Sequence, residues 1–364
     1  MSAHPHPEQH GETTDLFLSL TPEAVLAAVE QAGVTTRPVC YPLNSFENRV
    51  YEVELEDKTR VIAKFYRPGR WSREQILEEH ELLSELAAAE IPVGTVIPFP
   101  DGQTVHRTGR IYYALFERMG GRAPDEATEP LAHRLGMLAA RLHTVGATKD
   151  APHRLHLDAG SFVRPSLAWL EEHGSLPPHL AGRYLDAGRR IADRLDRLLE
   201  GVPVQRIHGD LHLGNVLDRD GRLVLVDFDD MVTGPPVQDL WLSIPGRDAD
   251  SDRLRQAFLA GYEQLRLFDV STLRLIEPLR ALRMIHYSTW LARRWHDPIF
   301  PATWPQFGSE TYWEQETEAL EELTAIIDSE SLTGDERKLW NVAEPGRPAE
   351  HDLGRALHVD LRDT

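Results

Sequence analysis

Three side chains in the second half of the 364-residue chain have the types and spacing needed to manage a phosphorylated substrate. Asp210 and Asn215 are separated by four residues, and Asp227 follows an apolar run of four. The Asp220-Gly221 pair predicts a hairpin turn that brings Asp227 back beside Asn215. An amide oxygen and a carboxylate are hard ligands suited to Mg²⁺ held jointly with phosphates. Asp210 would lie beside that metal, where it could orient an attacking hydroxyl or accept its proton.

This spacing resembles the catalytic loop of protein kinases, in which His-Arg-Asp-x4-Asn is followed by an Asp at a strand end. Gly209 stands in place of the Arg, and Asp-Phe-Asp stands in place of Asp-Phe-Gly. The form His-Gly-Asp-x4-Asn…Asp is similar to that of the aminoglycoside phosphotransferase-like branch of the kinase fold. The resemblance implies an α+β, bilobal protein-kinase-like fold, with a β-rich N-terminal lobe, a mainly helical C-terminal lobe and ATP between them.

A kinase also needs a cation for the nucleotide phosphates, and the first half of the chain offers one. Lys64 ends the strand-like run Val-Ile-Ala-Lys and matches the Lys that neutralises the α- and β-phosphates. Glu79, on the helix predicted after that strand, matches the Glu that pairs with this Lys. Glu78 is the nearby alternative, because one helical position is a turn of about 100°. A lone strand Lys is usually a surface residue, so the assignment of Lys64 depends on Glu79 and on the downstream residues.

The chain has no Gly-x-Gly-x-x-Gly motif ahead of these residues. The segment Pro-Leu-Asn-Ser-Phe-Glu-Asn-Arg-Val at 42–50 takes its place, and Asn44, Ser45 and backbone N–H groups there could contact phosphate oxygens. Residues 117–119 would line the adenine edge through backbone groups, with Glu117 and Met119 as the candidate contacts.

Longer blocks narrow the resemblance. Besides the 42–50 segment, they include Lys-Phe-Tyr-Arg-Pro-Gly-Arg-Trp, Gln-Ile-Leu-Glu-Glu-His and Gly-Pro-Pro-Val-Gln-Asp-Leu-Trp. These blocks resemble the stress response kinase A family of bacterial Ser/Thr protein kinases, and the resemblance runs from about residue 16 to about residue 323. It implies a cytoplasmic enzyme that uses ATP and Mg²⁺, phosphorylates protein Ser and Thr hydroxyls, autophosphorylates and acts in the stress response.

The resemblance also implies residue roles. It gives catalytic roles to Asp210 and Asp227, magnesium ligation to Asn215 and Asp227, and an ATP-loop contact to Ser45. With the assignments made from the residues, the nucleotide site is expected to comprise Asn44, Ser45, Lys64, Glu79, Glu117 and Met119. The expected partners are ATP and protein substrates, without nucleic acid or membrane; the sequence does not indicate an oligomeric state.

The elements that must position these residues follow from hydrophobic periodicity. The first half has β-rich segments at 39–66 and 91–116, the second with a hairpin around Asp101-Gly102, and a helix at 72–89. Met119-Gly120-Gly121 predicts a hinge. A β-rich island at 206–232 interrupts the second half. Helices are expected at 21–33, 130–144, 180–199, 251–265, 277–295 and 311–328. The predicted organisation is a flexible leader at 1–15, a nucleotide-binding lobe at 16–119, a catalytic and substrate lobe at 120–330 and a loose tail at 331–364.

Composition excludes several classes of function. The chain has 39 Lys plus Arg against 58 Asp plus Glu, a formal net charge of −19, which argues against general nucleic-acid binding. Cys40 is the only cysteine, so a disulfide framework or a multi-cysteine metal site is impossible. No apolar run approaches the roughly 18–20 residues of a transmembrane helix.

Rival functions remain open at this stage. A small-molecule kinase acting on an aminoglycoside, choline or a homoserine-like alcohol would share the catalytic loop, and an acidic pocket would suit a polycationic drug. A pseudokinase scaffold would signal by binding alone. A metallohydrolase built on His208 and His212 would need a helix to align the i, i+4 pair, yet Gly209 and Gly214 favour a loop.

Several neighbouring residues have structural interpretations. Asp229 and Asp230 are expected to be solvated or to bias a second metal, and Asp239 is expected to anchor the catalytic loop by hydrogen bonds. The stripe Leu279, Leu282, His286, Trp290 is interpreted as helix core. The run at 314–322 is interpreted as a solvated acidic face, and Cys40 as a small buried residue. Arg283, Arg293 and Arg294 form either a substrate or phosphate patch or a set of solvated side chains.

Overall fold

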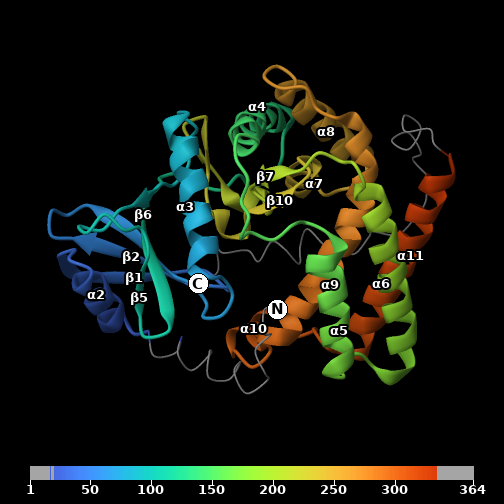
Figure 1. Cartoon of the computed structure of the whole chain (residues 1–364), viewed down its shortest axis with the longest axis horizontal. Coiled ribbons are helices and arrows are strands. Elements are labelled where there is room, and N and C mark those ends of the chain that lie inside the picture. The colour runs from blue at the N-terminus through green and yellow to red at the C-terminus, as the bar shows by residue number, and fades with distance from the viewer. Residues whose placement is uncertain (1–16, 18–19, 334–364) are drawn as a thin grey trace.

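A β-rich part is followed by a mainly helical part in the computed structural model (Figure 1), as the fold-class prediction requires. The structure describes residue 17 and residues 20–333. The predicted leader at 1–15 lies outside the described residues, and so does the predicted tail from residue 334 onward. The lobe boundaries at 119 and 330 stay predictions.

A six-stranded antiparallel sheet forms the β-rich part, with the order β1-β2-β3-β6-β4 and β5 paired to β6. The predicted turn at Asp101-Gly102 is present, since Gly102 N–H donates to the Phe99 carbonyl. The strands flanking that turn pair with β6 instead of with each other. The strands are β1 (Thr36–Leu43), β2 (Arg49–Leu55), β3 (Arg60–Phe65), β4 (Val96–Ile97), β5 (His106–Thr108) and β6 (Ile111–Glu117).

The two faces of this sheet bury different partners, because side chains alternate along each strand. Val61, Ala63 and Phe65 of β3 pack in a core with α2 (Pro22–Gln31), which Thr21 caps. Ile62 and Lys64 lie on the other face, toward α3 (Arg73–Ala88), which stands between the sheet and the helical part in Figure 1. A capping box of Ser72 and Gln75 starts α3. Lys64 and α3 therefore meet on the face directed at the second half of the chain.

The segment after β6 is fastened to the β-rich island. Arg122 and Asp218 exchange backbone hydrogen bonds of 3.0 and 2.9 Å. On the other side, Leu225 N–H donates to the Pro92 carbonyl at 2.9 Å. The strand that leads to Asp227 is thus held against the connection between α3 and β4. The island consists of the ribbons β7 (Gln205–Ile207) with β10 (Val232–Gly234) and β8 (Val216–Arg219) with β9 (Arg222–Leu225).

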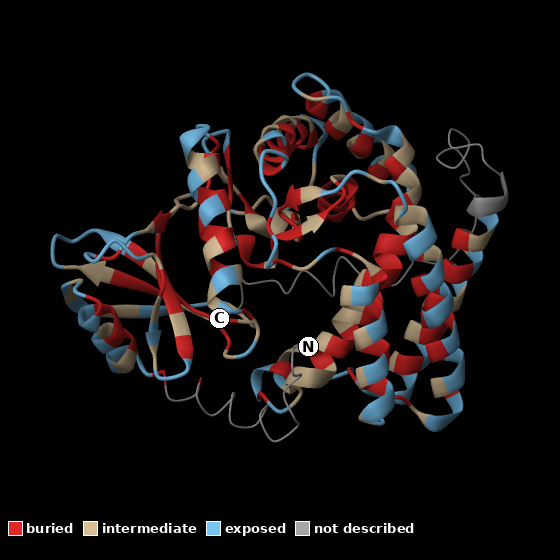
Figure 2. Cartoon of the chain, viewed as in Figure 1, coloured by how far each residue is buried: buried red, intermediate tan, exposed pale blue. Residues whose placement is uncertain are grey.

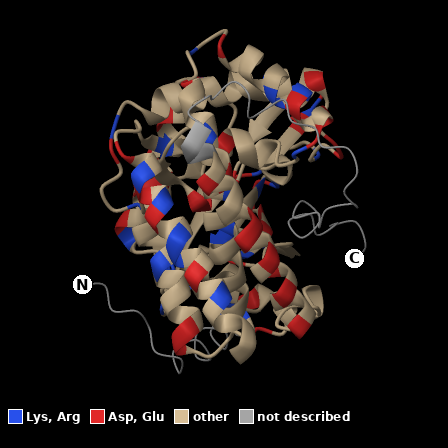
Figure 3. Cartoon of the chain, turned by 90° about the vertical axis from the view of Figure 1, so that its right-hand side faces the viewer, with Lys and Arg blue, Asp and Glu red and all other residues tan. Residues whose placement is uncertain are grey.

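Some helices lie beside this island and others pack together as a bundle next to it (Figure 1), and Figure 2 shows buried residues where the helices face one another. The outer face of the helical part carries mixed basic and acidic residues (Figure 3), and ion pairs such as Arg183–Glu321 and Arg190–Asp328 join α6 to α11. None of the described helices is long and apolar enough to cross a membrane. The helices are α4 (Glu129–Gly146), α5 (Arg164–Glu172), α6 (Pro178–Leu199), α7 (Val237–Ser243), α8 (Ala249–Tyr262), α9 (Ile276–Arg294), α10 (Ile299–Thr303) and α11 (Glu310–Thr333).

Two structural interpretations from the sequence were wrong in part. Leu279 is a core residue of α9, and Leu282 and Trp290 pack with the core while they also line a cavity, but His286 lines the cavity as a polar side chain. Glu316 belongs to the acidic run on α11, yet its carboxylate accepts a hydrogen bond of 3.1 Å from Ser288. Both exceptions have the same cause. One side of α9 faces the cavity, and its other side packs against α11.

Candidate active site

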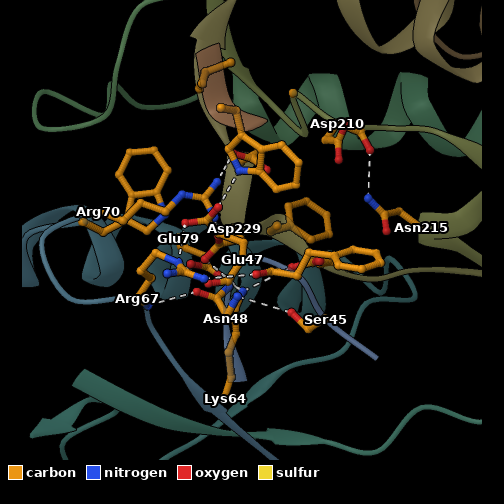
Figure 4. Close-up of a pocket in the computed structure, with 18 of the residues that line it drawn as sticks. Ser45, Glu47, Asn48, Lys64, Arg67, Arg70, Glu79, Asp210, Asn215 and Asp229 are labelled. Atoms are coloured by element: carbon orange, nitrogen blue, oxygen red, sulfur yellow. Dashed lines mark hydrogen bonds and ion pairs between the residues drawn. The ribbon is translucent and has the colours of Figure 1, made fainter. Parts of the chain in front are cut away.

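A cavity of about 990 Å³ lies where the sheet faces the island and the helices. All nine predicted site residues line it: Asn44, Ser45, Lys64, Glu79, Glu117, Met119, Asp210, Asn215 and Asp227. Figure 4 shows Lys64, Glu79 and Asp229 together at one side, while Asp210 and Asn215 lie next to each other at another. The sequence therefore identified residues that share one cavity although they come from both halves of the chain.

Lys64 is surrounded by carboxylates. Its Nζ lies 3.5 Å from Glu79 Oε1, 3.2 Å from Asp227 Oδ1 and 3.0 Å from Asp229 Oδ1. Burial lowers the pKa of Lys64, but the three carboxylates outweigh burial and raise this pKa well above its ordinary value. Lys64 is thus a permanently charged, buried cation that points into the cavity.

Glu79, not Glu78, faces Lys64. Its other oxygen, Oε2, lies 3.1 Å from Arg154 Nη2, so the carboxylate bridges two buried cations. Glu78 instead accepts backbone N–H groups from His153 and Arg154, at 3.0 and 2.9 Å. The two neighbours differ because one helical step turns the side chain from the cavity to the connection after α4.

Asp229 is buried and ion-paired, which corrects the expectation of a solvated residue. Arg70 Nη1 lies 2.5 Å from Asp229 Oδ2, and Arg154 donates to the Asp229 carbonyl at 2.7 Å. Burial raises the pKa of this carboxyl, but Arg70 and Lys64 outweigh burial and hold the pKa well below its ordinary range. Asp230 is half exposed and also contacts Arg70.

Asp239 anchors the backbone of the predicted catalytic loop by hydrogen bonds, as expected from the sequence. The Asp239 carboxylate accepts the N–H groups of His208 at 3.0 Å and Gly209 at 2.9 Å, and it lies 2.9 Å from His143 Nε2. Gly209 has φ +83°, and a Cβ there would lie 2.2 Å from the Asp230 carbonyl oxygen. Only glycine fits, which explains why the Arg of the kinase pattern is replaced.

His208 and His212 serve the same loop. His208 donates from Nε2 to the Val226 carbonyl at 3.0 Å and accepts the Asp210 N–H at Nδ1. His212 accepts the Gly214 N–H at Nδ1, and its Nε2 lies 3.5 Å from Asp210 Oδ2. The ring nitrogens are thus used by the loop itself, so the arrangement does not support a metallohydrolase.

Asp210 lies against a cation from α9. Arg283 Nη2 is 2.8 Å from Asp210 Oδ1. Burial raises the pKa of Asp210, but Arg283 and the nearby histidines outweigh burial and hold the pKa well below its ordinary value. Asp210 is consequently a carboxylate, which can accept a hydrogen bond but holds its own proton weakly.

Asn215 and Asp227 are brought together by the hairpin, as the turn predicted. Val226 N–H donates to the Asn215 carbonyl at 3.0 Å, one residue before Asp227. Asn215 Nδ2 donates to the Asp210 carbonyl at 2.9 Å, which leaves the amide oxygen as the group available to a ligand. Asp227 adopts φ +60°, and its side chain is 56 % exposed. A left-handed aspartate is a strained conformation of the kind found at functional sites.

The residues present fit a divalent cation. Asn215 supplies a neutral amide oxygen and Asp227 an accessible carboxylate, the hard oxygen donors that Mg²⁺ takes together with phosphate oxygens. These two residues would hold the ion.

The loop between β1 and β2 closes over the cavity. Ser45 Oγ accepts the Asn48 N–H at 3.3 Å, and Asn48 Oδ1 accepts the Arg67 N–H at 3.2 Å. The Arg67 side chain donates to the Glu47 carbonyl at 3.0 Å. Asn44 and Ser45 line the cavity, and phosphate contact by this loop stays a prediction.

A contact that the sequence did not predict ties this loop to the helical part. The Glu47 carboxylate accepts hydrogen bonds of 2.6 Å from Trp290 Nε1 and from Arg294 Nη2. Phe46 packs on Trp304 with ring centroids 4.8 Å apart. We call these residues (Phe46, Glu47, Trp290, Arg294 and Trp304) the loop anchor. Burial raises the pKa of Glu47, but the surrounding arginines outweigh burial and lower it to about 2.

A second link lies beside the loop anchor. Asp297, just after α9, pairs with Arg49 at 3.4 Å and with Arg67 at 3.3 Å. Sequence analysis missed Glu47, Arg67, Arg70, Arg154 and Asp297. The only available signal was that Glu47, Arg67, Arg70 and Asp297 fall within blocks that carried the family resemblance, the last of them in Ala-Arg-Arg-Trp-His-Asp-Pro at 292–298.

At the adenine side, Glu117 N–H donates to the Thr95 carbonyl at 2.8 Å. This N–H is therefore not free for a base. The Glu117 carbonyl and the Met119 N–H are the candidate contacts, and both residues line the cavity.

Comparisons with known proteins agree with this geometry. Residues 40–276 match the phosphotransferase enzyme family. Stress response kinase A of Escherichia coli (strain K12) is 35 % identical over 317 residues, which are 87 % of this chain and 96 % of that protein. Serine/threonine protein kinase RdoA of Salmonella typhimurium (strain LT2) is 36 % identical over 319 residues, 85 % of this chain and 94 % of that protein.

Solved structures show the same fold. An amicoumacin kinase in complex with AMP-PNP, Ca²⁺ and Ami has a TM-score of 0.63 at 21 % identity and covers 85 % of this chain and 96 % of its own. A microcompartment-associated aminopropanol kinase has a TM-score of 0.64 at 20 % identity and covers 86 % of this chain and 98 % of its own.

Proposed function

This chain belongs to the phosphotransferase enzyme family and to its stress response kinase A members, and we propose that it transfers the γ-phosphoryl group of ATP to Ser and Thr hydroxyls of proteins, itself included. The observation that carries the proposal is that Lys64 and Glu79 share one cavity with Asp210, Asn215 and Asp227. Together they form the set of charged and polar groups that phosphoryl transfer to an alcohol requires.

The nucleotide is held by the sheet side of the cavity. Lys64 binds the phosphates, while Glu79 and Arg154 fix the direction of its side chain through the 3.5 and 3.1 Å contacts. Asn44, Ser45 and the loop backbone cover the phosphates, and Glu117 and Met119 offer backbone groups to adenine. Asn215 and Asp227 hold Mg²⁺. When bound, the ion neutralises charge on the phosphate oxygens.

Asp210 orients the attacking hydroxyl and accepts its hydrogen bond. Arg283 and His212 hold this carboxylate in place from opposite oxygens. Because the transition state of phosphoryl transfer is loose, such positioning contributes more than strong basicity. A carboxylate of low pKa is therefore suited to the role.

The names of the relatives support a protein acceptor and a role in the stress response. We extend both to this chain, together with action in the cytoplasm on protein substrates. The second candidate is a small-molecule phosphotransferase, because the solved structures that share the fold are described as kinases of amicoumacin and aminopropanol.

Labelled ATP separates the two candidates. The purified chain is incubated with labelled ATP and Mg²⁺ alone, with a generic protein, and with a panel of aminoglycosides and small alcohols. Self-labelling and protein labelling at Ser or Thr support the proposal. Turnover of a small alcohol without protein labelling contradicts it, and absence of any transfer would favour a pseudokinase.

A further inference from the structure

The helical side of the cavity is basic. Residues from η1 (Ala159–Val163), α5 and α9 line it, and every one of them is neutral or basic. Three arginines of α9 contribute: Arg283, Arg293 and Arg294. The net charge of −19 describes the whole chain and not this side of the cavity.

Arg283 and Arg294 have carboxylate partners, whereas Arg293 has none among the described residues. Arg283 pairs with Asp210, and Arg294 pairs with Glu47 at 2.6 Å. Among the residues that the structure describes, no carboxylate pairs with Arg293, and its buried Nε has no hydrogen-bond partner. Its guanidinium lies 5.4 Å from the centre of the Trp169 ring.

Burial and the neighbouring Arg294 lower the pKa of Arg293 to about 10. The guanidinium is therefore charged at neutral pH but lacks the counter-charge that a partly buried cation ordinarily has. A planar, desolvated Arg held on an indole is a suitable binding group for a carboxylate, because it can present two parallel N–H donors.

Side chains from two sides of the cavity line the space between Arg293 and Asp210. His286 of α9 and Phe162 of η1 meet with ring centroids 5.0 Å apart, and Arg293 of α9 contacts Trp169 of α5. Arg283, beside Asp210, is ten residues from Arg293 on α9, which corresponds to about 15 Å along the axis. An extended peptide spans this length with about four or five residues, and long side chains shorten the interval.

We propose that Arg293 with Trp169 is a specificity subsite that binds an acidic side chain of the protein substrate, about three to five residues from the phosphorylated Ser or Thr. The inference rests on the proposed function and adds a substrate class to it. It disfavours the amino groups of polycationic acceptors such as aminoglycosides at this subsite, because Arg293 would repel them.

Peptide kinetics test the subsite. Each test peptide contains one Ser and one variable residue, which lies three, four or five positions before or after that Ser. The variable residue is Glu, Gln or Lys, and kcat/KM is measured for each peptide. We expect at least one Glu peptide to exceed its Gln partner about tenfold, mainly through KM, as a charge-assisted hydrogen bond predicts. Equal values for Glu, Gln and Lys peptides would overturn the inference.

Substitutions at Arg293 test whether this residue causes the preference for Glu peptides. Arg293→Gln should bring the Glu-to-Gln ratio close to one, Arg293→Lys should keep part of it, and Arg293→Glu should reverse it in favour of Lys peptides. Arg197→Gln, an exposed arginine on α6, is the matched control and should keep the ratio. A ratio unchanged in Arg293→Gln overturns the inference, and thermal melting checks that each variant folds. Failure of the proposed function looks different, since neither self-labelling nor any peptide or protein labelling would then occur.

Discussion

Arg283 contacts the carboxylate of Asp210, with 2.8 Å between Nη2 and Oδ1, although the two residues are 73 positions apart. The contact joins the catalytic loop to α9, the helix that also carries Arg293 and Arg294. Asp210 is thereby fixed from a second element in addition to its own loop. Two elements thus position the carboxylate of Asp210. One is its own loop, which Asp239 holds, and the other is α9, which lines the proposed acceptor site.

Asp210→Asn should lower kcat for phosphoryl transfer by about 10²–10⁴-fold, because the amide loses the charge that Arg283 holds in place and orients the attacking hydroxyl poorly. The shape is conserved, so far-UV circular dichroism should not change. Arg283→Gln removes only the contact that positions Asp210, so kcat should fall less, by about tenfold. Full activity of the purified Asp210→Asn protein in the labelled-ATP assay would contradict the assignment.

Lys64→Met should reduce kcat/KM for ATP by about 100-fold or more, because the phosphates lose a charged partner inside the cavity. Lys149→Met is the control. Lys149 is half exposed and pairs with Glu81 at 2.7 Å and Glu85 at 2.6 Å, and surface pairs of this kind contribute about 0–1 kcal/mol. Nucleotide titration and steady-state kinetics measure both variants, and similar losses in the two would refute a special role for Lys64.

Gly209→Ala should abolish activity and lower the thermal midpoint. The new Cβ would lie 2.2 Å from the Asp230 carbonyl oxygen at φ +83°, so the catalytic loop must shift. Gly182→Ala is the matched control, because Gly182 lies in α6 with nothing within 4 Å of the added Cβ. This second change should stabilise the protein by about 0.5–1 kcal/mol. Tolerance of Ala at position 209 would show that the loop geometry is not required.

Glu47→Gln should loosen the loop anchor. The amide keeps the shape but leaves the guanidinium of Arg294 without its charge partner, and breaking a buried pair costs about 3–5 kcal/mol. We expect faster proteolysis within 44–48 and a raised KM for ATP, with kcat less affected. Glu54→Gln, on β2 near the exposed Arg37, is the control for loss of one acidic charge. Unchanged proteolysis would mean that the aromatic contacts of Phe46 suffice.

Glu316 should make stability depend on pH. Burial raises its pKa from 4.5 to about 7, and a hydrogen bond from Ser288 lowers it only in part. Because the folded pKa exceeds the unfolded one, the stabilisation is complete below about pH 4.5 and is lost as the pH rises through about 7. The loss is at most about 3 kcal/mol. Glu316→Gln should remove this dependence.

Urea unfolding at pH 5, 6, 7 and 8 measures the effect. The difference in unfolding free energy between Glu316→Gln and the unmodified protein should grow in favour of the variant as the pH rises. Glu314→Gln, at an exposed position on the same helix, should show no such trend. Parallel curves for the protein and Glu316→Gln would disprove the assignment.

Local sequence patterns predicted much of the fold. Helices with one apolar face, such as α3 and α4, and the hairpin at Asp220-Gly221 were correct because period and turn chemistry are local. The short helix α7 was missed, since all seven of its residues are buried and no amphipathic period remains. The interpretation of His286 as core failed because a cavity wall has the same periodicity as a core.

The candidate site was predictable only where residues follow each other at fixed spacing. Asp210, Asn215 and Asp227 form such a series, and Lys64 with Glu79 forms another. Arg67 and Asp297 pair across 230 positions, and no local pattern marks a long-range ion pair. Arg293 was noticed, but its unpaired state depends on every neighbour and so required the structure.

The three carboxylates around Lys64 have a consequence for how a nucleotide enters. Without phosphates, Glu79, Asp227 and Asp229 already balance Lys64, and Arg70 and Arg154 balance the remainder. Under the proposed function, the phosphates of ATP do not meet an unpaired Lys64. They displace one of its three carboxylate partners. Phosphate then replaces a carboxylate at Lys64, and the displaced Asp227 would be free to hold Mg²⁺ together with Asn215. Affinity for nucleotide without a divalent ion should accordingly be weak, because the displaced carboxylate would have no counter-ion.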